Sequence, residues 1–281
     1  MRLLTWNIQW GRGRDGRVDL ARVAATIAGH GADLVCLQEV AVNHPGLPGA
    51  PAGDQTAHLQ ALLTGYTAAY AVGSDLPDGH GGRRCFGNLI LSRRPLLQVF
   101  RHLLPWPADP AVPSMQRVAL EAVVDAPGGP LRVLTSHLEF YSPSQRAAQV
   151  EALRTLQAEG HGHACHPAAA GDDDPPFAVL PRGQATVICG DFNFAPGSAE
   201  YARLQAPFDD DVPTLCDAWQ ALHPAQPQPP TAGLVTTPWL AAPGCYDYFF
   251  VSANLLPRLG EMRVDDGADG SDHQPVALTL V

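Results

Sequence analysis

Short apolar runs that end in polar residues recur along this chain, and they constrain its fold more than any other sequence feature. The clearest begins at Val187, where an apolar run predicts a buried strand and Gly190 lets the backbone turn before Asp191 and Asn193. Residues two apart in an extended segment point the same way, so this carboxylate and this amide are expected to face one spot. Taken alone, such a motif marks a polar turn more often than a functional site.

The same arrangement occurs at five further places along the chain, which are Thr5–Asn7, Leu37–Glu39, Thr135–His137, Tyr246–Tyr248 and Ser271–His273. In α/β folds, side chains at strand ends and in the loops that follow them gather in one crevice. We therefore expect all six ends to contribute to a single site.

Six such ends, in this order, resemble the endonuclease/exonuclease/phosphatase superfamily, also called DNase I-like. It includes exonuclease III-type nucleases, sphingomyelinases, inositol-polyphosphate phosphatases, deadenylases and tyrosyl-DNA phosphodiesterases. The resemblance runs from Arg2 to Val281. It implies an α/β fold, the four-layer α/β sandwich, in which two packed mixed β-sheets carry helices on their outer faces.

The spread of the motifs also bears on domain organisation. A chain of 281 residues with 46% hydrophobic content can bury the core of one large domain or of two. The motifs run from residue 7 to residue 273, so a division would separate parts of the site. We expect a single domain, residues 1–281, that is a monomer.

Hydrophobic periodicity and turn residues predict the elements between the motifs. Asp19 is a good N-cap for a helix over residues 20–28, and a capping box from Ser142 to Gln145 opens a helix that runs to about Glu159. A further helix is predicted over residues 55–63, and strands over residues 3–9, 34–37, 66–72, 86–93, 96–104, 117–124, 131–136, 246–251 and 275–280. Loops are predicted over residues 43–54, 73–84, 160–184, 205–214 and 223–244, and the loop 73–84 is expected to overhang the site.

The net charge and the cysteines limit the partners and the compartment. Lys+Arg 18 against Asp+Glu 28 gives a net charge of 18 − 28 = −10. Tight sequence-indifferent duplex binders usually carry a basic surface, so nucleic acid is a possible partner that the charge does not favour. The six cysteines show no paired spacing and are expected to be reduced, buried thiols. With no signal peptide or membrane span predicted, we expect a soluble cytoplasmic protein.

Hydrolysis of a phosphate ester needs a cation on the phosphoryl oxygens, a base for water, and donors for the developing charge. Glu39 is the natural ligand for Mg²⁺, with Mn²⁺ as a substitute, because magnesium takes one or two protein carboxylates plus substrate oxygens. The resembled superfamily uses the matching glutamate in this way. Without its neighbours, Glu39 would be an ordinary glutamate in a solvated turn.

The resemblance also implies roles for the other motif residues. Asn7 would hold Glu39 or a metal-bound water, and Asp272 would act on the metal side. Asp191 would deprotonate the attacking water and Asn193 would bind a phosphate oxygen. A protonated His273, paired with Asp247, would donate to the same anion. Taken alone, an aspartate at position 247 or 272 is as often a surface or turn residue.

His137 bears on the subclass. Superfamily members that act on sphingomyelin, inositol phosphates, poly(A) or phosphotyrosyl-DNA typically have histidine here, where it would bind a non-bridging oxygen or protonate the leaving group. Arg117 is a candidate for substrate binding, and Arg146 and Gln149 lie on the following helix; packing explains these three equally well. Trp219 and Trp239 are candidates for a pocket wall, although large aromatic residues more often lie in the core.

Two classes of function follow. The first is a Mg²⁺-dependent hydrolase of phosphate esters, most simply a phosphodiesterase, with a nuclease acting on DNA or RNA as the alternative and sphingomyelinase-like or inositol-phosphatase-like activity less favoured. The second is a non-catalytic binding protein that kept the fold, which the full set of acids, amide and histidines disfavours. His161, His163, Cys165 and His166 could form a metal tract, but their irregular spacing is more typical of a solvated segment.

Overall fold

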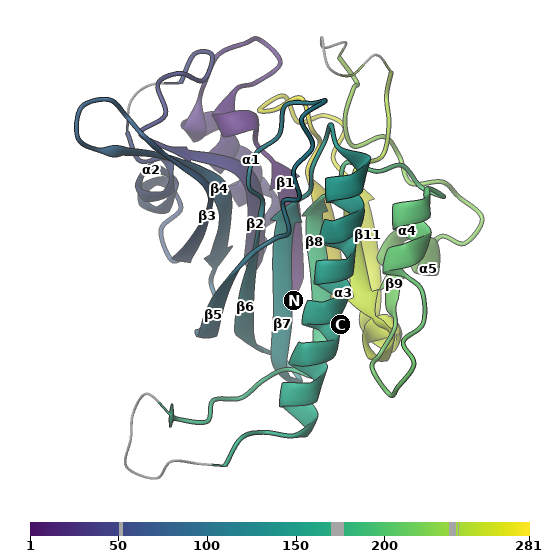
Figure 1. The fold of residues 1–281 in the computed structure, drawn as a ribbon. Helices are drawn as coiled ribbons and strands as arrows, with labels where there is room; N and C mark the ends of the chain where they lie inside the picture. Colours follow the sequence, from purple (N-terminus) through teal and green to yellow (C-terminus); the bar gives the residue numbers. More distant parts are fainter. Residues whose placement is uncertain (51–52, 170–176, 236–239, 241) are drawn as a thin grey trace.

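The protein folds into two six-stranded mixed β-sheets, seen in a computed structural model that describes residues 1–50, 53–169, 177–235, 240 and 242–281 (Figure 1). The first sheet has the strand order β11-β12-β1-β2-β4-β3, with bounds Leu259–Val264, Val276–Leu280, Arg2–Asn7, Leu34–Val42, Arg83–Ser92 and Thr67–Pro77. The second has the order β5-β6-β7-β8-β10-β9, with bounds Leu96–Leu103, Val118–Ala126, Gly129–His137, Ala185–Asp191, Asp247–Ser252 and Leu215–Asp217.

Helices cover the outer faces of both sheets. On the first sheet lie α1 (Leu20–His30) and α2 (Gln55–Leu62), and on the second lie α3 (Pro143–Cys165) and α4 (Ala199–Leu204). The short helix α5 (Ala218–Leu222) and the 3₁₀ turns Gln9–Gly11 and Ala253–Arg258 complete the described elements.

Three apolar cores account for the four layers. The first lies between the sheets and joins residues such as Leu3, Leu120 and Phe249. The other two lie beneath the helices of each outer face, where Ile27 packs over the first sheet and Leu153 over the second. The predicted four-layer α/β sandwich is therefore confirmed. No helix in the described part of the chain is long and apolar enough to cross a membrane.

Strand pairing brings the sequence motifs together. Strands β1 and β2 are parallel, with Asn7 opposite Gln38, so Asn7 and Glu39 are close neighbours. Strands β7 and β8 are also parallel and place His137 opposite Asp191. Antiparallel pairing of β10 with β8 then puts Asp247 opposite Asp191 on its other side. Three side chains that are far apart in the sequence thus form one row across the second sheet.

The predicted loop 73–84 is wrong, because most of it forms the β3–β4 hairpin. Only residues 78–82 connect the two strands, and Asp78 Oδ1 stabilises this turn by accepting from the backbone N–H groups of His80 and Gly82. Backbone hydrogen bonds to β4 keep this part of the edge strand β3 extended, and these bonds do not depend on the side chains of the segment. At Gly87 a side chain would collide with the backbone of Ala71, so glycine is needed for this close approach.

Several other boundaries differ from prediction. Helix α3 runs to Cys165, beyond the predicted end at Glu159, so part of the predicted loop 160–184 is helical; residues 170–176 lie outside the described chain. The elements α4, β9 and α5 were not predicted, since each is too short to show a periodic pattern, and β11 was missed because it contains a glycine and two charged residues. All six cysteines are free, and Cys165 is exposed, contrary to the expectation of burial.

The tract of histidines around Cys165 does not gather. His161 Nε2 lies 3.4 Å from Cys165 Sγ, one helical turn away. Within the described part of this segment, no three His, Cys, Asp or Glu side chains converge on a common point.

A buried ionic cluster in the second sheet gives a prediction about stability. Glu121 is 1% exposed and accepts from Arg132 Nε at 2.9 Å, from Arg182 Nη2 at 3.2 Å, and contacts His102 Nε2 at 3.0 Å. Burial opposes ionisation of Glu121, but His102 and the two arginines outweigh it and lower its pKa to about 2. Because the folded pKa lies below the ordinary 4.5, the ionised carboxylate adds stability above about pH 4.5, which is lost as the pH falls toward 2.

We expect Glu121→Gln to lower the free energy of unfolding at pH 7 by about 3–5 kcal/mol, the usual cost of leaving buried charges unpaired. The loss of stability between pH 4.5 and 2 should also be smaller in the variant. Denaturant unfolding at several pH values measures both effects. The control is Glu151→Gln, which removes a half-exposed pair with Arg203 and should cost under about 1 kcal/mol. Equal costs for the two variants would contradict the prediction.

Candidate active site

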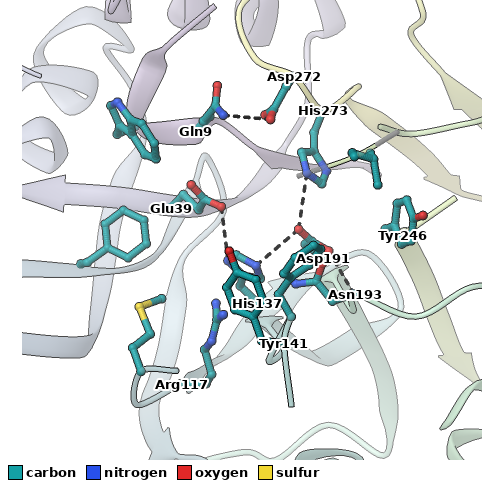
Figure 2. A pocket seen from close by; sticks show the side chains of 15 residues that line it. Gln9, Glu39, Arg117, His137, Tyr141, Asp191, Asn193, Tyr246, Asp272 and His273 are labelled. Carbon is teal, nitrogen blue, oxygen red and sulfur yellow. Dashed lines mark hydrogen bonds and ion pairs between the residues drawn. The ribbon is translucent and has the colours of Figure 1, made fainter. Parts of the chain in front are cut away.

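The six motifs meet at a cavity of about 290 Å³ (Figure 2), although Glu39 lies within β2 rather than at its predicted end, and Asp272 and His273 lie before β12. It is lined by Gln9, Trp10, Glu39, Phe86, Met115, Arg117, His137, Phe140, Tyr141, Asp191, Asn193, Leu240, Tyr246, Asp272 and His273. Of the predicted site residues, seven line the cavity, and Asn7 and Asp247 lie directly behind it through hydrogen bonds to that lining.

Asn7 links the two sheets at the base of the site. Its Nδ2 donates to Glu39 Oε1 and to Asp191 Oδ2, each at 3.0 Å, and its Oδ1 accepts from the backbone N–H of Gln9 at 3.0 Å. The side chain is 1% exposed, so water does not compete for these bonds. One amide therefore fixes the separation of the two carboxylates.

Glu39 occupies a bulge in β2, where the register with β4 shifts between Leu37 and Val40. Its φ of 59° lies in the left-handed region, which a residue with a side chain rarely adopts. The bulge turns the carboxylate into the cavity. In a regular strand, the direction of this side chain would follow the simple alternation of successive residues between the two faces of the sheet. Burial raises the pKa of Glu39 to about 7 against the hydrogen bond from Asn7, and the charge of Asp272 adds to the rise.

Asp191 and Asn193 follow β8 through a turn. Asp191 is 1% exposed, and burial raises its pKa to about 6 although the positive charge of His273 opposes the rise. Its Oδ1 accepts from the backbone N–H of Asn193 at 3.1 Å. Asn193, at a φ of 52°, donates from Nδ2 to Leu138 O at 2.9 Å. An amide nitrogen has two hydrogens, so the second is available to a ligand.

His273 and Asp247 form a close pair. His273 Nδ1 lies 2.8 Å from Asp247 Oδ2, and its Nε2 lies 3.6 Å from Asp191 Oδ2. Burial disfavours the charged imidazole, but Asp247, Asp191 and Asp272 together outweigh burial and raise the pKa of His273 well above its ordinary value. The cation is therefore held between two carboxylates, with one ring nitrogen directed toward the cavity.

His137 has the opposite protonation state from His273. Burial lowers its pKa well below the ordinary value, and the charges of Arg117 and His273 lower it further. Its Nδ1 lies 3.7 Å from Glu39 Oε1 and its Nε2 lies 3.5 Å from Asp191 Oδ2. The imidazole is thus neutral at pH 7 and offers one N–H donor beside the two carboxylates.

Arg117 supplies a fixed cation at the cavity. It is 7% exposed, and its Nε donates at 3.2 Å to the fully buried Glu139. Its Nη1 is buried and bonds to nothing within the described part of the chain. Glu139 is itself held, since its Oε1 accepts from the backbone N–H of Tyr141 at 2.9 Å.

The donor set fits a hard divalent cation. Glu39 and Asp272 both face the cavity, and Asp272 Oδ2 is oriented by Gln9 Nε2 at 2.8 Å. Burial raises the pKa of Glu39 and the charge of Asp272 adds to the rise, so a divalent cation bound here would stabilise the ionised carboxylate. Asp191, Asp247 and His273 are also close enough to surround an ion. We favour Glu39 and Asp272, because a protonated His273 has no lone pair to offer a metal.

The remaining sequence candidates lie elsewhere. Trp219 packs in the core between the sheets and donates from Nε1 to Gln226 O at 2.9 Å, so it does not line this cavity. Arg146 pairs with Glu200, and Gln149 is fully buried and accepts from the Glu139 backbone. Trp239 lies outside the described residues.

Sequence reasoning missed several cavity residues, namely Gln9, Trp10, Phe86, Met115, Phe140, Tyr141, Leu240 and Tyr246. Gln9 and Trp10 directly follow the first motif, and their positive φ values of 44° and 45° could not be foreseen. Tyr246, which precedes Asp247 in its motif, also lines the cavity and lies across the Asp191–His273 pair from Glu39 (Figure 2).

Comparisons with known proteins identify a matching family and similar folds. The model of the Endonuclease/Exonuclease/phosphatase family matches residues 4–273. No curated protein sequence matches the chain significantly.

Solved structures with a similar fold cover the whole chain. An endonuclease/exonuclease/phosphatase from Beutenbergia cavernae is 25% identical, with a TM-score of 0.65 and 71% of its own chain covered. TDP2 of D. rerio, complexed with a single-strand DNA product, is 23% identical, with a TM-score of 0.64 and 98% covered. A mannosyl-6-phosphatase of Bacteroides thetaiotaomicron is 15% identical, with a TM-score of 0.64 and 99% covered.

Proposed function

We propose that this chain, which belongs to the endonuclease/exonuclease/phosphatase family, is a Mg²⁺-dependent phosphodiesterase. The observation that carries the proposal is the bridge from Asn7 to Glu39 and Asp191, because it holds a metal carboxylate and a base carboxylate at one cavity. A charged His273 stands beside them. Two of the structural neighbours are described with a single-strand DNA product and as a mannosyl-6-phosphatase, so the fold alone does not select the substrate.

The residues divide the work of an attack by water on phosphorus, in which the P–O bond to the leaving group breaks as the new P–O bond forms and the leaving oxygen takes its proton from solvent. Asp191, with a pKa of about 6, is ionised at neutral pH and close enough to neutrality to accept the proton of water. His273 donates from its cavity-facing nitrogen to the charge that develops on the phosphoryl oxygens, and Asn193 donates its free amide hydrogen to the same oxygens. Glu39 and Asp272 would hold a divalent cation, which would neutralise charge on the phosphoryl oxygens.

Neutral His137 and the free Nη1 of Arg117 contact non-bridging oxygens on the side opposite His273. Because His137 is uncharged at pH 7, we assign it a binding role rather than that of a general acid. The hydrogen bond to Glu139 holds Arg117 in position.

A substrate panel tests the proposal. We expect bis-p-nitrophenyl phosphate to be hydrolysed faster than p-nitrophenyl phosphate in the presence of Mg²⁺, with single- and double-stranded DNA, RNA and sphingomyelin as the other members of the panel. Faster turnover of the monoester would replace the phosphodiesterase by a phosphatase. Preferred cleavage of DNA or RNA would instead identify a nuclease.

The His273–Asp247 pair predicts a pH dependence. His273 acts as a cation, so activity persists at pH values below its pKa, and Asp247 holds that pKa above the ordinary value. Removing the carboxylate charge in Asp247→Asn should lower the pKa, and the alkaline limb of the pH–rate profile should move to lower pH. Asp265→Asn is the matched control, because Asp265 lies 3.0 Å from His30 Nε2 away from the cavity. An alkaline limb that stays in place in Asp247→Asn would remove Asp247 from the chemistry.

A further inference from the structure

One side of the cavity is aromatic and adjoins the metal-side residues. Trp10 and Phe86 line it together, with ring centroids 6.5 Å apart and planes inclined at 55°. Trp10 directly follows Gln9, whose side chain bonds to Asp272. Phe86 lies on β4 opposite Ala41, two residues beyond Glu39 on the paired strand. We call these two rings the Trp10–Phe86 wall.

Trp10 is held at this place against its backbone preference. Its φ of 45° and ψ of 31° are left-handed, which for so bulky a residue is a conformational outlier. Its backbone oxygen accepts from Gln55 Nε2 at 2.8 Å, and its ring Nε1 donates to Pro48 O at 3.1 Å. Gln55 is in turn fixed because its Oε1 accepts from Ala41 N at 3.0 Å. Such strain at the edge of a site points to a use for the ring there.

The wall carries no formal charge, and because Phe86 is 9% exposed, the half-buried Trp10 presents more of its open surface. Aromatic faces attract cations as well as apolar groups, and among apolar groups flat rings gain most from aromatic partners in tilted or offset contact. The wall begins beside Glu39 and Asp272. A substrate with its phosphate at these two carboxylates and a ring on the wall would therefore need only a short ester arm between the phosphate and the ring.

We propose that the Trp10–Phe86 wall selects phosphodiesters in which the ester arm that is not the leaving group carries a planar aromatic ring. This inference rests on the proposed phosphodiesterase function and adds the substrate class. The ring can come from a nucleoside base or from a simple arylmethyl alcohol, since both present a flat face.

Three diesters with a common leaving group test the selection, namely methyl, benzyl and thymidine-5′ p-nitrophenyl phosphate. Release of p-nitrophenolate is followed with Mg²⁺ present, so any difference between the substrates belongs to the second arm. We expect KM for the benzyl and thymidine esters to lie about 5- to 100-fold below that of the methyl ester, the range that aromatic stacking of a base usually spans. A preference for the thymidine ester over the benzyl ester identifies a nucleoside, and equal values identify the ring alone.

Variants assign the effect to the wall. Trp10→Ala should raise KM for the benzyl and thymidine esters by a similar factor, leave kcat within about twofold, and leave the methyl ester unaffected. Phe86→Leu, which keeps an apolar side chain, should have a smaller effect in the same direction and serves if Trp10→Ala folds poorly. Trp106→Ala is the control, because Trp106 is 50% exposed on another loop and does not line the cavity.

Different experimental results would contradict the aromatic selection and the proposed phosphodiesterase function. Two results overturn the aromatic selection but not the proposed phosphodiesterase function. One is hydrolysis of all three esters with equal KM, and the other is an increase in KM in Trp10→Ala that is as large for the methyl ester as for the benzyl and thymidine esters. Absence of hydrolysis of any diester by the folded, Mg²⁺-loaded protein overturns the phosphodiesterase itself.

Discussion

Asp191→Asn should lower kcat by at least about 10²-fold, the usual scale for the loss of a catalytic base. The amide cannot accept the proton of water, although it has nearly the size and shape of the carboxylate. His273→Ala should have an effect of the same scale, because it removes the proposed donor to the developing charge. Asp191 ends β8 and His273 lies in the segment before β12, both at a cavity rather than within an apolar core, so the fold should persist.

Turnover and a thermal melt are measured on the same samples. Asp217→Asn is the matched control for Asp191, because Asp217 is also a buried aspartate at the end of a strand in the second sheet and burial raises its pKa as well. Its Oδ2 accepts from Tyr201 Oη at 2.7 Å, away from the lining of the cavity. Asp217→Asn should change the melting temperature and not kcat per folded molecule. If Asp191→Asn loses activity only in proportion to folded protein, Asp191 is structural.

Removal of divalent cations should abolish turnover altogether. Glu39 and Asp272 face the cavity with carboxylates that a hard cation would neutralise, and Mg²⁺ or Mn²⁺ should restore activity after treatment with EDTA. Glu39→Gln should raise the metal concentration needed for half-maximal activity and lower kcat, because it removes the charged oxygen ligand.

A second readout is independent of turnover. Binding of Mg²⁺ to the folded state should raise the melting temperature of the wild-type protein, and this shift should be reduced in Glu39→Gln. Glu261→Gln, a change of an exposed glutamate on β11, should behave like the wild type. Full activity in excess EDTA, or unchanged metal dependence in Glu39→Gln, contradicts the assignment.

The general plan of the molecule could be predicted because it depends on local patterns. Apolar runs of strand length, the Asp19 cap and the capping box at Ser142 each announce an element from a few adjacent residues. The order of polar strand ends then indicated which side chains share a site. The β3–β4 hairpin was missed because pairing with a partner strand, rather than the composition of residues 73–77, makes that segment a strand.

The sequence predicted which residues gather at the cavity better than it predicted how their side chains are arranged there. The bridge from Asn7 to Asp191 joins residues 184 positions apart, and nothing near either residue announces it. The bulge at Glu39 and the turn at Trp10 arise from tertiary hydrogen bonds, such as those of Gln55, that override local preference. The neutral state of His137 and the charged state of His273 likewise follow from burial and neighbours that only the assembled fold provides.

Four residues at the cavity, Gln9, Trp10, Glu39 and Asn193, have a left-handed backbone. At these positions, selection for heat resistance and selection for catalysis would favour different residues. Each such residue costs the folded state about 1–3 kcal/mol, and glycine would adopt the same conformation at little cost. A population selected only for survival at high temperature would therefore accumulate glycine at these four positions and become inactive. A population selected for turnover as well would have to gain its thermal tolerance elsewhere, in the apolar layers beneath the helices.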